Sequence, residues 1–209
     1  MRTITDIYAE YKIPKNLQLH QLRVAAVAKI MCDNLTVSVD TENVVCAALL
    51  HDMGNIIKFD LGVFPESLEP EGREYWEGVK KEYIETYGTN EHEASIHIIR
   101  EITGSERLAY LAECVDLGHV DERMDTDDFG VKIVSYVDNR MGLTGVVSVN
   151  ERRADNARRY PEFETWREAF YDSILVVEKQ IQDVCTLDLQ TVTNEMLAPI
   201  VEELRSFEI

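Results

Sequence analysis

The chain has 209 residues and a formal net charge of −18. Its length is sufficient to bury a substantial core in a single domain spanning residues 1–209. The negative charge argues against long nucleic acids as partners, because affinity for them depends largely on lysine and arginine contacts with phosphates. No apolar run reaches the ~20 residues of a membrane span and no basic, apolar leader opens the chain, so we expect a cytoplasmic protein without a membrane partner.

Helical signals run along nearly the whole chain, and no alternating strand pattern persists. Asn16 can cap a helix that runs to about Asn34, and Asp40 or Thr41 can cap the next one. Gly54 is expected to end this second helix in the way that a C-terminal glycine does. The pattern predicts an all-α fold, a single-domain helical bundle.

The most apolar segment of the chain is Val44–Leu50, and it is followed directly by His51 and Asp52. A helix with no polar side must be buried, so this histidine and this carboxylate enter the interior. An unpaired charge is costly there, and both side chains therefore need a partner. A metal cation is the obvious candidate.

Three other histidines, His20, His92 and His119, lie on apolar helical stripes, as Asp138 does. The stripe of His119 comprises Leu108, Leu111, Ala112 and Val115. A single histidine on such a face is usually a core residue bonded to a carbonyl, but so many inward polar residues together favour a shared metal site. His97 has mainly charged neighbours at the same spacings, and we interpret it as a surface residue.

The order of these residues resembles the HD-domain superfamily of metal-dependent phosphohydrolases, defined by a histidine, a His-Asp doublet and a distant aspartate. The matching residues are His20, His51-Asp52-Met53-Gly54, His92, His119 and Asp138. The resemblance covers about residues 16–160, with 161–209 as a C-terminal helical extension. It includes the two extra histidines that complete a two-metal site in one subset of the family.

This resemblance implies a ligand set and a reaction. One ion would be held by His20, His51, Asp52 and Asp138, and Asp52 would bridge to a second ion held by His92 and His119. A hydroxide bridging the ions would attack the phosphorus of a small phosphate ester, a nucleotide or a related metabolite. Imidazole and carboxylate ligands suit iron or manganese, with zinc, nickel, cobalt and magnesium as alternatives.

One departure from the family pattern is Asn55, which stands where many relatives carry a lysine or arginine after the His-Asp-x-Gly turn. Lys58 and Arg140 are candidates to supply the missing catalytic cation, although Lys58 could equally be a solvated loop lysine. Asn55 also keeps a second hypothesis open. The chain could be a metal-containing nucleotide-binding or regulatory HD module with little catalytic activity.

Residues 65–90 form a charged insertion whose predicted helix, from Glu71 to Thr86, presents Tyr75, Trp76 and Tyr83. Aromatic residues at helical spacing favour an ordinary packed surface helix over a lid above the site.

An arginine-rich segment over residues 151–160 supplies Arg152, Arg153 and Arg158 as candidate substrate-binding residues, because the planar guanidinium suits phosphate oxygens. The alternative is a helix face paired with nearby acids. The tail from Pro161 predicts two further helices, which either close the site or form a homodimer contact.

Overall fold

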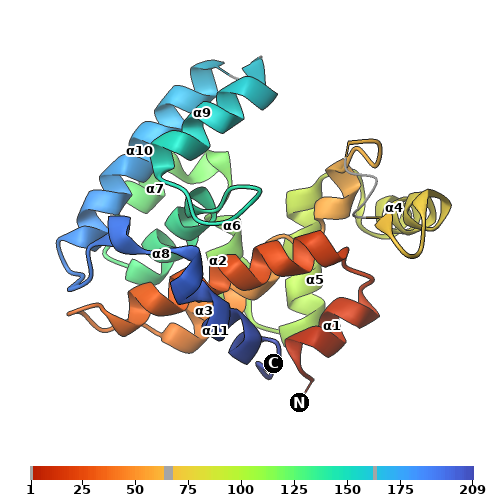
Figure 1. Ribbon diagram of the computed structural model, residues 1–209, viewed down its shortest axis with the longest axis horizontal. Helices are drawn as coiled ribbons and strands as arrows, with labels where there is room; N and C mark the ends of the chain where they lie inside the picture. The colour runs from red at the N-terminus through yellow and green to blue at the C-terminus, as the bar shows by residue number, and fades with distance from the viewer. Residues whose placement is uncertain (1, 64–67, 162–163) are drawn as a thin grey trace.

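The computed structural model describes residues 2–63, 68–161 and 164–209 (Figure 1). Its α-helices are α1 (Ile4–Glu10), α2 (Lys15–Asp33), α3 (Thr41–Leu50), α4 (Arg73–Tyr87), α5 (Glu91–Thr103), α6 (Glu106–Glu113), α7 (Val120–Asp125), α8 (Phe129–Val137), α9 (Val149–Arg159), α10 (Glu164–Gln182) and α11 (Asn194–Leu204). Short 3-10 helices are η1 (Asn55–Lys58), η3 (Leu117–His119), η4 (Asp138–Arg140) and η6 (Leu189–Thr191). Isolated bridges are the sole β-pairing among the described residues, and the predicted all-α class is confirmed.

The centre of the fold is the pair α2 and α3, which lie against each other in the middle of the molecule (Figure 1). Small side chains such as Ala25 and Ala28 of α2 and Ala47 and Ala48 of α3 are completely buried, which allows the two helix backbones to come close. Helices α6 and α8 pack on α3, and α8 and α11 pack on α2. This arrangement encloses the apolar part of α3, Val44–Leu50, as its sequence requires.

The predicted helix starts differ in accuracy. Helix α3 begins as expected, because the Asp40 carboxylate accepts a hydrogen bond of 3.1 Å from the backbone N–H of Asn43. Helix α2 instead begins at Lys15, directly after Pro14, so Asn16 is inside the helix and does not cap it. Proline suits this place because it fixes φ and has no N–H to leave unsatisfied.

Gly54 has a different role from the one expected. Helix α3 ends at Leu50, and Gly54 follows with φ −89°, which is not the left-handed conformation of a C-terminal glycine. The missing side chain matters for packing, since a Cβ atom there would lie 2.4 Å from the Glu91 carbonyl oxygen of α5. Gly54 therefore lets the turn after α3 touch α5, and its N–H donates to Ser95 Oγ at 2.9 Å.

Helix α4 is a packed surface helix at the edge of the molecule (Figure 1). It lies against η1 and α5 and buries Trp76, Val79 and Tyr83, and the Trp76 indole N–H donates to the Leu68 carbonyl at 3.1 Å. Packing therefore accounts for these aromatic residues, while Tyr75 remains exposed. The first part of the predicted insertion, residues 65–67, lies outside the described residues.

The C-terminal part contains the two helices predicted beyond Pro161. Helix α10 packs on α7, α8 and α9, and α11 returns to α2. No helix in the described part of the chain combines the length and apolar character needed to cross a membrane.

Candidate metal centre

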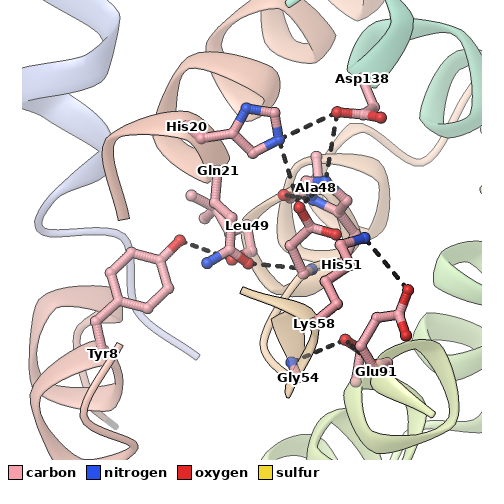
Figure 2. Close-up of polar contacts among 12 residues, drawn as sticks. Tyr8, His20, Gln21, Ala48, Leu49, His51, Gly54, Lys58, Glu91 and Asp138 are labelled. Carbon is pink, nitrogen blue, oxygen red and sulfur yellow. Dashed lines mark hydrogen bonds and ion pairs between the residues drawn. The ribbon is translucent and has the colours of Figure 1, made fainter. Parts of the chain in front are cut away.

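The ends of two helices and the side of a third form the candidate centre (Figure 2). His20 projects from α2, His51 caps the C-terminal end of α3 and precedes Asp52, and Asp138 caps the C-terminal end of α8. Because α2, α3 and α8 pack on one another, these four side chains meet although they lie up to 118 residues apart in the sequence.

Two imidazole nitrogens and two carboxylate oxygens face one another in this centre. His20 Nε2 lies 3.1 Å from Asp138 Oδ1 and 3.5 Å from Asp52 Oδ2. His51 Nε2 lies 3.5 Å from Asp52 Oδ2 and 3.8 Å from Asp138 Oδ1. Within the described residues, suitable donor atoms of His20, His51 and Asp52 all lie within 4.8 Å of one another, close enough to share one ion.

His51 provides the test of whether a metal fits. Its Nδ1 lies 2.8 Å from the Ala48 carbonyl oxygen, an acceptor, so Nδ1 carries a proton and Nε2 is the nitrogen that a metal ion would bind in place of a proton. Nε2 is buried and has no hydrogen-bond partner among the described residues. An unsatisfied buried nitrogen is costly, and a cation would satisfy it. Orientation of a ligand histidine through its other ring nitrogen is typical of metal sites.

The electrostatics of the centre also favour a cation. Burial alone would lower the pKa of His51, but the charges of Asp52 and Asp138 outweigh it and raise the pKa to about 9. Burial opposes ionisation of Asp138, yet the neighbouring imidazoles of His20 and His51 hold its pKa well below the usual range. The centre therefore stabilises positive charge between its two carboxylates.

Gln21 is a supporting residue that the sequence did not reveal. Its side-chain oxygen accepts a hydrogen bond of 3.3 Å from the backbone N–H of Asp52, and the residue is fully buried. Tyr8 supports the same turn, since its hydroxyl donates to the Leu49 carbonyl at 2.7 Å. A glutamine next to His20 on an apolar helix was the one available signal.

The family model of the HD domain matches residues 18–140, a span that contains every residue of this centre and more than half of the chain. The chain belongs to the HD domain family. This is a family of metal-dependent phosphohydrolases that bind divalent metals, and the candidate ligand group agrees with that chemistry. No curated protein and no solved structure matches the chain.

Lys58 lies at the edge of the candidate centre of this HD domain (Figure 2). Its Nζ is 3.4 Å from Glu91 Oε1, and its side chain is 52% exposed. Burial lowers the pKa of Lys58, but the nearby carboxylates of Asp52, Glu91 and Asp138 raise it more. Lys58 is therefore a protonated amine beside the centre as well as a residue in contact with solvent.

Arg140 does not take the position expected for it. Its guanidinium donates to the carbonyls of Val147 at 2.6 Å and Leu189 at 2.9 Å and to the Tyr136 hydroxyl at 2.7 Å. These contacts bury the side chain and fasten the segment after η4 to the C-terminal part of the fold. The structure thus gives Arg140 a structural role in place of one beside a phosphate.

His92 and His119 are not among the donors that meet at Asp52 within the described residues. His92 Nε2 lies 3.3 Å from the Glu113 carbonyl oxygen, and His119 Nδ1 lies 2.7 Å from Glu122 Oε2. The expected stripe of His119 is interrupted because α6 ends at Glu113 and His119 falls in η3. A second ion at Asp52 therefore stays a prediction.

The remaining histidine and two of the candidate arginines face away from the centre. His97 is 58% exposed and lies 3.7 Å from Glu101, as a surface histidine should. Arg153 pairs with Glu168 and with Asp172 of α10, and Arg158 is 77% exposed beside an acid of its own helix. The ion-paired alternative therefore describes Arg153 and Arg158, whereas Arg152 has no such partner in the part of the chain that the structure describes.

Proposed function

We propose that this HD domain is a metal-dependent hydrolase of a small phosphate ester, a nucleotide or a related phosphorylated metabolite. The observation that carries the proposal is the buried Nε2 of His51, which makes no hydrogen bond with any described residue and lies 3.5 Å from Asp52 Oδ2 and 3.8 Å from Asp138 Oδ1. Purely structural histidines have their polar atoms satisfied, so this geometry favours a catalytic ion.

The proposed ligands are His20, His51, Asp52 and Asp138. A divalent ion, iron or manganese in our proposal, would supply charge that acidifies water and neutralises the phosphoryl oxygens. The chain itself holds the ligands in place. The Ala48 carbonyl fixes the tautomer of His51, and Gln21 fixes the backbone at Asp52.

Lys58 is the proposed catalytic cation that replaces the residue missing at Asn55. In hydrolysis, the water oxygen forms a bond to phosphorus, the ester P–O bond breaks, and the departing alkoxide takes up the proton lost by water. Negative charge grows on the departing oxygen, and a protonated amine beside the centre stabilises it. The surrounding carboxylates keep Lys58 protonated at neutral pH, because they raise its pKa.

The two-ion arrangement can be tested apart from the reaction. If His92 and His119 hold a second ion, replacing either by alanine should lower the metal content from two ions per chain to one. His97→Ala is the control and should change nothing, since His97 lies at the surface. A wild-type content of one ion, unchanged in His92→Ala, would limit the centre to its first ion.

The reaction is tested with protein loaded with manganese or iron and a panel of nucleotides, together with p-nitrophenyl phosphate and bis(p-nitrophenyl) phosphate. We expect turnover that chelation abolishes and that Asp138→Asn removes. Asp33→Asn, an exposed acid of α2 paired with Lys29, is the matched control and should stay active. Tight nucleotide binding without turnover would reject the proposal and favour a regulatory HD module. The cytoplasmic location and a homodimer contact stay predictions.

A further inference from the structure

Arg152 differs from its arginine neighbours on α9. Arg153, Arg158 and Arg159 each form an ion pair with an acid, at 3.1 Å, 3.3 Å and 2.6 Å. Arg152 forms no ion pair with any described residue, and its Nε is buried without a hydrogen-bond partner. A buried guanidinium nitrogen without a hydrogen-bond partner is costly, and an anion bound at this guanidinium would offset that cost.

The position of Arg152 places it beside the metal centre. Helix α9 packs on η4, which begins with Asp138, and on α10, which contains the buried Tyr171. Burial is the main cause that raises the pKa of Tyr171, and the opposite charges of Arg152 and Asp138 both act on this residue, which agrees with the packing of α9. Arg152 therefore approaches the centre from α9, whereas Lys58 approaches it from η1.

The charges indicate which anion this arrangement fits. The positive charge of a divalent ion would be balanced by the negative charges of the Asp52 and Asp138 carboxylates, and Glu91 offsets part of the charge on Lys58. Among the described residues, the guanidinium of Arg152 is then a positive charge beside the centre without an ion-pair partner, and its planar fork can bind two phosphate oxygens at once. An ion that takes one oxygen and a fork that takes two require three terminal oxygens. A phosphomonoester has three, and a phosphodiester has two.

We propose that Arg152 binds the terminal phosphate of the substrate and makes the site selective for phosphomonoesters over phosphodiesters. This inference rests on the proposed hydrolase function.

The test compares Arg152→Ala and Arg152→Lys with the wild type, using p-nitrophenyl phosphate, bis(p-nitrophenyl) phosphate and inorganic phosphate as a competitive inhibitor. Loss of a charge-assisted bidentate contact should raise the monoester KM and the phosphate inhibition constant about 10- to 100-fold. Diester turnover should change less than about threefold, and Arg152→Lys should recover part of the monoester KM because it restores charge without the fork. Arg205→Ala, an exposed arginine paired with Glu202, is the control.

Metal content and thermal melting of each variant separate a lost contact from misfolding, and Arg152→Lys decides the question if Arg152→Ala does not fold. An active wild type whose monoester KM and phosphate inhibition are unchanged in both variants would overturn the role of Arg152 and leave the hydrolase intact. If the wild type is inactive, titration calorimetry with inorganic phosphate replaces the kinetics. Phosphate binding that Arg152→Ala weakens would then support the phosphate contact without the hydrolase, and no phosphate binding would overturn both.

Discussion

Gly54→Ala is the sharpest test of how the turn after α3 is packed. The new Cβ would lie 2.4 Å from the Glu91 carbonyl oxygen, 2.8 Å from the Ala94 Cβ and 2.9 Å from the Ser95 backbone nitrogen. None of these atoms belongs to a flexible side chain that could move aside. Because the φ of Gly54 is −89°, alanine suffers no backbone strain, and the whole effect should come from the collision with α5.

The expected cost follows from two losses. Overpacking in a dense interior costs about 1–3 kcal/mol, and weakening the hydrogen bond from Gly54 to Ser95 Oγ adds about 1 kcal/mol. A total of about 2–4 kcal/mol lowers the melting temperature by about 4–16 °C for a chain of this size. The measurement is thermal and urea unfolding of chelated protein, followed by circular dichroism.

Gly78→Ala is the matched control, because Gly78 lies exposed inside α4 and a Cβ there would meet nothing within 4 Å. Alanine in a helix interior should stabilise the protein by about 0.5–1 kcal/mol. The two glycine substitutions should therefore have opposite signs. A Gly54→Ala variant as stable as the wild type would refute the close approach of η1 to α5.

Three further outcomes are expected. Asp52→Asn should reduce metal-dependent phosphatase turnover about 100-fold or more while the chelated protein melts near the wild-type temperature, and near-normal turnover would exclude Asp52 from the reaction. Hydrogen bonds from Arg107 are the main cause that lowers the pKa of Asp128 in the folded state. The stability that this carboxylate contributes is therefore complete above about pH 4 and is lost as the pH falls. Asp128→Ala should flatten the acid side of a plot of stability against pH, and an unchanged slope would contradict this. Tyr8→Phe deprives the buried Leu49 carbonyl of its hydroxyl donor and should cost about 1–3 kcal/mol in urea unfolding, and no change would show that this hydrogen bond contributes nothing.

Burial was the part of the site that the sequence could predict. An all-apolar helix has only one environment in which it is stable, so the positions of His51 and Asp52 inside the fold followed from Val44–Leu50 alone. The apolar helical stripe before Asp138 also predicted an inward-facing surface correctly, because Val131 and Val134 are both buried in α8. These inferences need helical periodicity and no knowledge of tertiary contacts.

The directions of long or terminal side chains could not be predicted in this way. His119 does not lie on the apolar face expected for it, because α6 ends at Glu113. The residue at which a helix ends is the least certain part of a prediction from sequence periodicity. Arg140 turned to the carbonyls of Val147 and Leu189, which only the folded chain places within reach. Arg152 and Arg153 are adjacent in the sequence, yet of these two only Arg153 pairs with described acids of α10, a difference that depends on where the folded chain places α10.

The helices around the centre would also act on a bound ion through their backbones. His51 and Asp138 are the C-cap residues of α3 and α8, so the partial negative charge at the end of each helix dipole lies next to the ligands. This field remains when a ligand side chain is replaced. We therefore expect single-ligand variants to keep a weak affinity for cations, while the same two helix ends repel a free phosphate anion and favour its departure after cleavage.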